Sequence, residues 1–68
     1  MKFTSSKTAR ILKEKGRITK PSWGDVQWLS TTEMGVIQHY MVRGSAIYFE
    51  RYVLSFDDIF TEVWEVLK

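Results

Sequence analysis

Trp23 lies in a segment that could form a stacking platform, because its large flat ring stands between a cation, Lys20, and an anion, Asp25. Pro21 fixes its own φ angle and favours an extended conformation at Lys20, so the chain is stiff before the tryptophan. Ser22 and Gly24, which flank Trp23, are typical of turns. The indole would then be held at a bend, beside these two charges, where a ligand could stack on it. Alternatively it fills the core, because a small domain needs large aromatic side chains there.

Residues suited to catalysis are few. His39 is the only histidine, and its position in a β-prone run favours a hydrogen-bonded structural role. There is no cysteine or second histidine to build a metal site. Asp57 and Asp58 are adjacent at a predicted helix start, where carboxylates interact with the helix dipole. We therefore expect a binding protein with no catalytic residue, no bound metal and no cofactor.

A basic helix precedes the Trp23 segment. Ser5 or Ser6 can cap its start, and the helix is predicted to run to about Lys15. Gly16 can adopt the left-handed conformation that closes a helix. The predicted helix has a narrow apolar face, formed by Ala9, Ile11 and Leu12 with Thr8 beside them. A short β-prone step, Arg17–Thr19, follows the glycine.

Three β-prone runs follow the bend at Pro21. A strand that carries Trp28 is predicted over Val26–Ser30, and residues 30–35 form a turn-rich connection after it. Val36–Val42 and Ala46–Val53 predict a hairpin, joined by Arg43-Gly44-Ser45. Alternation along the last run places Ile47, Phe49, Arg51 and Val53 on one face and Ala46, Tyr48, Glu50 and Tyr52 on the other. Both faces are partly apolar, which is consistent with cover on both sides, for example by a second subunit.

The last segment predicts a helical turn and a final strand. Ser55 can cap the turn. An apolar face is expected from the i, i+3, i+4, i+7 spacing of Phe56, Ile59, Phe60 and Val63. Residues 64–67 are β-prone and should join the sheet. The predicted fold class is α+β: an N-terminal helix packed on a small antiparallel sheet, with a short helical turn before the last strand.

The length and composition predict one small folded domain over residues 1–68. Such a chain buries only roughly 60% of the surface that its unfolded form exposes. Without cysteine there is no disulfide, so oligomerisation is the remaining common source of stability. No run approaches the ~18 apolar residues of a membrane span, and residues 1–12 lack the core of a signal peptide. We expect a cytoplasmic protein and no membrane partner.

Charge is distributed unevenly along the chain, although the net charge is only +2. Residues 1–20 hold seven basic residues and one acidic residue, whereas 49–68 hold five acidic residues and two basic ones. The basic end suits an anionic ligand or head-to-tail contact between subunits, or simply forms a solvated surface. Because the aromatic residues lie mostly outside the basic third, nucleic acid is a less favoured partner.

Four short motifs occur in an order that resembles a known family. They are Leu12-Lys-Glu-Lys-Gly16, Ile18-Thr-Lys-Pro-Ser-Trp23, Trp28-Leu29 and Ser55-Phe-Asp-Asp-Ile-Phe-Thr-Glu-Val-Trp-Glu-Val66. This arrangement, over roughly residues 8–67, is similar to the phage Thoeris anti-defence sponges. The chain departs from the family pattern at Lys20, where arginine is usual, and at Val63, where aspartate is frequent.

The resemblance implies a non-enzymatic function. Family members bind a cyclic ADP-ribose-type immune signal, and some relatives bind cyclic oligonucleotide signals, which they withhold from the bacterial effector without degrading them. It also implies a homodimer or homotetramer in the host cytoplasm, with aromatic-lined pockets at subunit interfaces. The predicted ligand-binding residues are Lys20, Pro21, Ser22, Trp23, Gly24, Asp25 and Trp64, although Trp64 also suits core or interface packing. The alternative function is a small phage inhibitor that binds a host protein or nucleic acid through its charged faces.

Overall fold

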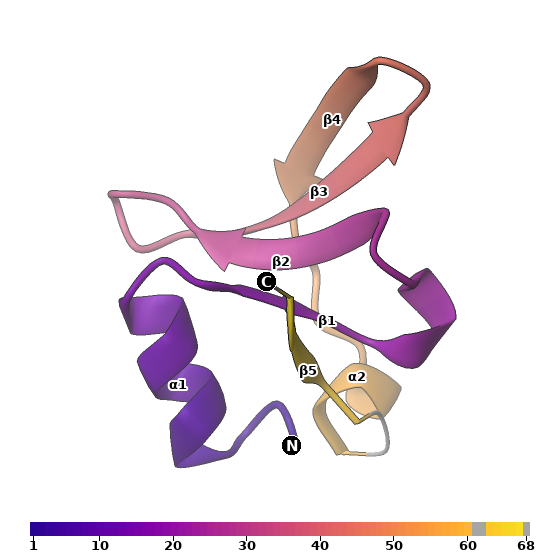
Figure 1. Cartoon of the computed structure of the whole chain (residues 1–68). Helices are drawn as coiled ribbons and strands as arrows, with labels where there is room; N and C mark the ends of the chain where they lie inside the picture. The colour runs from indigo at the N-terminus through magenta and orange to yellow at the C-terminus, as the bar shows by residue number, and fades with distance from the viewer. Residues whose placement is uncertain (61–62, 68) are drawn as a thin grey trace.

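A computed structural model describes residues 1–60 and 63–67 of the chain (Figure 1). Its elements are α1 (Ser6–Lys13), β1 (Arg17–Thr19), the 3-10 turn η1 (Pro21–Trp23), β2 (Gln27–Thr31), β3 (Ile37–Arg43), β4 (Ala46–Arg51), α2 (Phe56–Phe60) and β5 (Glu65–Leu67). The strands form one antiparallel sheet in the order β4-β3-β2-β1-β5. The predicted α+β fold is confirmed, including the final strand and the short helix before it.

Helix α1 begins as its sequence predicts. The Ser5 hydroxyl accepts a hydrogen bond of 3.2 Å from the Thr8 amide, which satisfies one of the free donors at the helix start. Thr8 and Leu12 are buried, and Ile11 is half-buried. Ala9, which was predicted to share the apolar face, is exposed instead. The buried stripe is therefore narrower than the sequence pattern indicated.

The helix ends differently from the prediction. It stops at Lys13, and Lys15 rather than Gly16 has the left-handed conformation, with φ of 62°. Hydrogen bonds from the Gly16 amide to Ile11 O (2.8 Å) and from the Lys15 amide to Leu12 O (3.1 Å) close the last turn. Gly16 is needed for space, because a methyl group there would lie 2.7 Å from Ile11 Cγ2.

The two faces of the sheet differ in cover. One face carries Ile18 and Leu29, which pair across β1 and β2 and form the core with Leu12 of α1 and Trp64. We call this the helix face. The opposite face carries Trp28, Tyr40 and Phe49, which the register places side by side on β2, β3 and β4. We call this the open face, because no helix in the described part of the chain packs on its rings.

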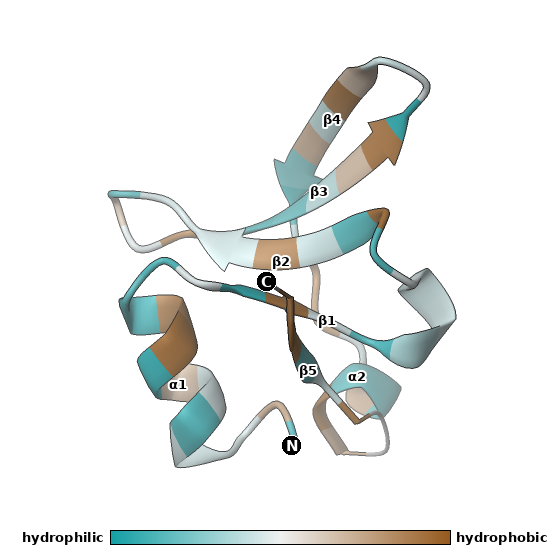
Figure 2. Ribbon diagram, viewed as in Figure 1, coloured by the Kyte–Doolittle hydropathy of each residue, from teal (hydrophilic) through white to brown (hydrophobic). Residues whose placement is uncertain are grey.

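The hairpin β3–β4 projects from the rest of the molecule (Figure 1). The predicted hairpin is confirmed, with Gly44 at φ of 60° in its turn, although β4 ends at Arg51 rather than at Val53. Every residue of β4 is exposed, and its hydrophobic positions show as brown bands in Figure 2. Within the described residues of one chain, neither face of β4 has the cover that its sequence suggested.

Helix α2 packs with a face that was not predicted. The Ser55 hydroxyl accepts a hydrogen bond from the Asp58 amide (3.2 Å), so the predicted cap is confirmed. However, Phe56, Phe60 and Val63 are exposed by 74%, 52% and 56%. The buried side chain of this helix is Asp58, which makes polar contacts with Lys20, just after β1, and with Tyr52, just after β4. Apolar spacing alone therefore misassigned the buried side of α2.

The end of α1 gives a test of this geometry. We expect Gly16→Ala to lower the free energy of unfolding by about 1–3 kcal/mol, because the new methyl group overpacks against Ile11. Lys15→Gly should raise it by about 0.5–1 kcal/mol, because glycine adopts positive φ without strain, at some cost in unfolded-state entropy. Urea denaturation measures both. The opposite order of stabilities would contradict the assignment of the left-handed residue.

Candidate functional site

Trp23 lies at the edge of the core and stacks on a side chain of the protein itself. Its ring is nearly parallel to that of His39, with 4.5 Å between the centroids. The edges of Trp64 and Tyr52 contact it at centroid distances of 5.3 Å and 6.0 Å. The Lys20 ammonium lies 4.7 Å from its centroid, a cation–π contact. The half-buried indole packs against the core, as the alternative prediction has it, and stacking of Trp23 on a ligand stays a prediction.

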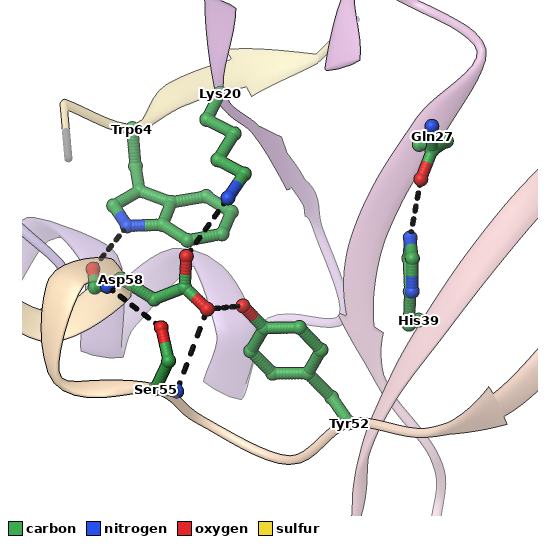
Figure 3. Close-up of polar contacts among 7 residues, drawn as sticks. All are labelled: Lys20, Gln27, His39, Tyr52, Ser55, Asp58 and Trp64. Atoms are coloured by element: carbon green, nitrogen blue, oxygen red, sulfur yellow. Dashed lines mark hydrogen bonds and ion pairs between the residues drawn. The ribbon is translucent and has the colours of Figure 1, made fainter. Parts of the chain in front are cut away.

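Lys20 is paired within the protein. Its ammonium donates to an Asp58 carboxylate oxygen at 2.8 Å, and both side chains are largely buried (Figure 3). The Tyr52 hydroxyl donates to the other carboxylate oxygen. Burial opposes ionisation of Asp58, but hydrogen bonds from Lys20, Tyr52 and Ser55 outweigh it and lower the pKa of Asp58 to about 2. The carboxylate is therefore ionised at neutral pH and compensates the lysine charge.

Trp64 packs next to the Lys20–Asp58 pair, with its ring centroid 5.9 Å from the Lys20 ammonium. Its side chain is 1% exposed, and its indole nitrogen donates to the Asp58 carbonyl at 2.8 Å (Figure 3). The Trp64 amide donates to the carbonyl of Met1 at 2.7 Å, which ties the start of the chain to its end. The structure thus gives Trp64 the packing role, and its contact with a ligand stays a prediction.

The other four predicted site residues lie on the surface beside Trp23. Pro21, Ser22, Gly24 and Asp25 are all exposed. The turn that carries them is fixed from below, because the Thr19 hydroxyl hydrogen-bonds the carbonyls of Gly24 (2.9 Å) and Gln27 (2.7 Å). The structure therefore brings Lys20, Trp23 and Trp64 into one cluster and leaves these four residues at its exposed rim.

His39 connects this cluster to the hairpin. Its Nε2 lies 2.9 Å from the Gln27 side-chain oxygen (Figure 3), and its Nδ1 lies 3.9 Å from the Glu50 carboxylate. Burial lowers the pKa of His39, an effect that the nearby Glu50 carboxylate partly opposes. The ring is therefore mostly neutral at pH 7. The hydrogen bond predicted for His39 is therefore present, with Gln27 as its partner.

A hollow of about 430 Å³ adjoins His39 on the helix face of the hairpin. Its lining residues are His39, Met41, Arg43, Tyr48, Phe49 and Glu50. The volume lies within the range of small-molecule sites. Arg43, Tyr48 and Glu50 are all exposed, so the hollow offers a cation, a phenol ring and a carboxylate to a ligand.

None of the hollow's residues was among the predicted ligand-binding residues. Part of the hollow could have been predicted from the sequence, because strand alternation places Tyr48 and Glu50 on one face. The two-residue turn then fixes the register that sets His39 opposite Glu50 and Met41 opposite Tyr48. Among residues 1–60 and 63–67, no group of three histidine, cysteine or acidic side chains is arranged to hold a metal ion. In the same residues, no helix has the length and apolar character needed to cross a membrane.

Comparison with protein-family models, curated proteins and solved structures finds no match for the chain. The resemblance to the anti-defence sponges therefore rests on the motifs of the sequence alone. The function proposed below depends on those motifs and on the chemistry of the site.

The Asp58 cluster predicts an acid-sensitive fold. The folded-state pKa of Asp58 lies below its ordinary value, so its contribution to stability is complete above about pH 4 and is lost as the pH falls toward 2. Asp58→Asn should lower the free energy of unfolding at pH 7 by ~1.5–3 kcal/mol and should flatten its dependence on pH between 4 and 2. Denaturation across this pH range measures both effects. The exposed Asp25→Asn is the control, and an equal loss for both variants would contradict the role of the cluster.

Proposed function

We propose that this protein binds a cyclic nucleotide or cyclic ADP-ribose-type immune signal and holds it without altering it. In this proposal it acts as a phage anti-defence sponge in the cytoplasm of the bacterial host. The sequence motifs point to this ligand class. The observation that carries the proposal is the hollow on the helix face, where a cation, an aromatic ring and a carboxylate line one volume.

The three exposed groups of the hollow match the three parts of a nucleotide. The Arg43 guanidinium can donate two parallel hydrogen bonds to a phosphate. The Tyr48 ring, which is 56% exposed, can stack on a base. The Glu50 carboxylate can accept hydrogen bonds from a ribose hydroxyl or a base amino group. Together they favour a ligand with all three parts over a simple anion.

The contacts of His39 support holding the ligand rather than hydrolysing it. One ring nitrogen is hydrogen-bonded to Gln27, and the other lies 3.9 Å from Glu50, beyond direct hydrogen-bond distance. Stacking on Trp23 fixes the plane of the ring. These contacts hold the His39 ring in place between Trp23 and the hollow.

A second subunit would deepen this site. β4 lies at one edge of the sheet, where its outer backbone groups can pair with another strand. Ile47, Tyr48 and Phe49 are more than half exposed there. A second copy joined along this edge, and extending over the helix face, would cover the hollow. We therefore propose a homodimer or homotetramer as the signal-binding form.

The ligand proposal is tested by binding and release. The protein is incubated with a panel of cyclic nucleotides and cyclic ADP-ribose isomers, washed, and heated, and the released compound is identified by mass spectrometry. We expect an intact ligand, whereas a degraded one would contradict sequestration. Arg43→Ala should weaken binding by ~10- to 150-fold through the lost charged hydrogen bonds. Arg51→Ala, on the same hairpin but with its side chain on the open face, is the matched control and should bind normally.

The assembly proposal is tested by light scattering. At micromolar concentration we expect two or four times the chain mass of 8.0 kDa, because the exposed β4 surface is buried between copies. Dilution should shift the mass toward 8.0 kDa, and bound ligand should oppose that shift if the site lies between subunits. A monomer at micromolar concentration, with or without ligand, would contradict the proposed assembly.

A further inference from the structure

The open face joins aromatic and basic residues that are far apart in the sequence. The register aligns Trp28, Tyr40 and Phe49 in a row across β2, β3 and β4. The rings of Trp28 and Tyr40 are nearly parallel at 5.8 Å, and those of Tyr40 and Phe49 are tilted at 5.9 Å. The Arg17 guanidinium lies 5.2 Å from the Trp28 centroid, at the β1 end of the row. Phe49, at the other end, is 64% exposed.

A second row runs beside the aromatic one, two residues along each strand. It consists of Arg17 on β1, Ser30 on β2, Gln38 on β3 and Arg51 on β4, which the register sets next to one another. The two arginines stand at its ends, and Arg51 is exposed. The Gln38 carbonyl oxygen accepts a hydrogen bond from the Tyr40 hydroxyl, so its amide group remains as a donor. This row therefore carries two positive charges and no acidic residue.

We propose that the open face binds single-stranded nucleic acid. Bases would lie against the aromatic row, and phosphates would contact the guanidinium groups of Arg17 and Arg51. A positively charged track beside aromatic rings is the arrangement that binds single strands without reading sequence. Four strands at about 4.8 Å spacing give a row of about 14 Å, which is enough for a few nucleotides.

The charge of the face favours this ligand over a second copy of the chain. Among the described residues of β1–β5, the register places three charged side chains on this face: the two arginines and Glu65. Glu65 is on β5, where it pairs with Thr19 of β1. A copy of the same face would set arginine against arginine, which is unfavourable. A polyanion instead neutralises both guanidinium groups and releases counterions.

The charged groups of this site are separate from those of the hollow in the proposed function, although Phe49 borders both sites. Arg43 and Glu50 belong to the helix face, whereas Arg17 and Arg51 belong to the open face, because neighbouring residues of a strand point to opposite sides. A ligand on one face therefore leaves the charged groups of the other exposed. Arg43→Ala and Arg51→Ala therefore test both proposals: each variant removes a charge from one site and is the control for the other.

The test is fluorescence anisotropy with a labelled oligothymidylate of about ten nucleotides, titrated at several salt concentrations. We expect binding that weakens with salt, with a slope of log K on log[salt] of about −1.4 for two neutralised phosphates. Arg51→Ala and Arg17→Ala should each reduce the slope by about 0.7 and weaken binding several-fold at low salt. Arg43→Ala should leave oligothymidylate binding unchanged while it weakens binding of the cyclic nucleotide-type ligand. A duplex of the same length should bind at least about tenfold more weakly, because its bases are not free to stack.

Substitutions of Trp28 test whether the aromatic row contacts the bases. Trp28→Phe retains a ring and should retain binding, whereas Trp28→Leu should weaken it ~5- to 150-fold if it remains folded, which circular dichroism checks. No binding at low salt, equal binding of the duplex, or unchanged slopes in both arginine variants would each overturn the proposal. So would cross-linking between open faces in the free protein, which would show that a second copy occupies the face.

Discussion

The carboxylate of Asp58 is the contact on which the arrangement of this small fold depends. It binds the ammonium of Lys20 after β1 and the hydroxyl of Tyr52 after β4. The same residue receives the Ser55 cap of its own helix through its amide and the indole of Trp64 through its carbonyl. One residue thus joins Lys20 to the last part of the chain, from Tyr52 to Trp64. An ion pair with so little solvent contact is stable only when its remaining polar atoms are also satisfied, as they are here.

The position of this contact explains why one half of the sheet is covered by other parts of the chain and the other half is not. α1, Trp64 and the Asp58 cluster all gather over β1 and β2, where the core is found. Beyond His39, on which Trp23 stacks, the hairpin has little cover from the described residues, and β4 is exposed throughout. A short chain has too little material to cover a five-stranded sheet. The uncovered half is therefore the part of the protein available for ligands and for other chains.

The two faces of the hairpin present different chemistry for the same geometric reason. Alternation along β3 and β4 sends His39, Arg43 and Glu50 to the helix face and Tyr40 and Arg51 to the open face. The helix face of the hairpin holds the hollow and carries charges of both signs, which suits a compact ligand such as a nucleotide. The open face carries a row of rings beside a row with an arginine at each end, which suits an extended ligand. The proposed functions of the two faces are thus independent.

The sequence by itself determined the local elements of this protein: the Ser5 cap, the hairpin turn at Gly44, the Ser55 cap and the final strand. These depend on residues within a few positions of one another, so short patterns predict them. It also predicted the bend of the Trp23 segment, where the chain forms η1. Only the tertiary structure decided what surrounds that segment, because the stacking partner His39 is 16 residues away and the ion-pair partner Asp58 is 38 residues from Lys20. The same holds for the rows of rings and cations on the open face, since strand register, which no local pattern of one strand specifies, sets them side by side.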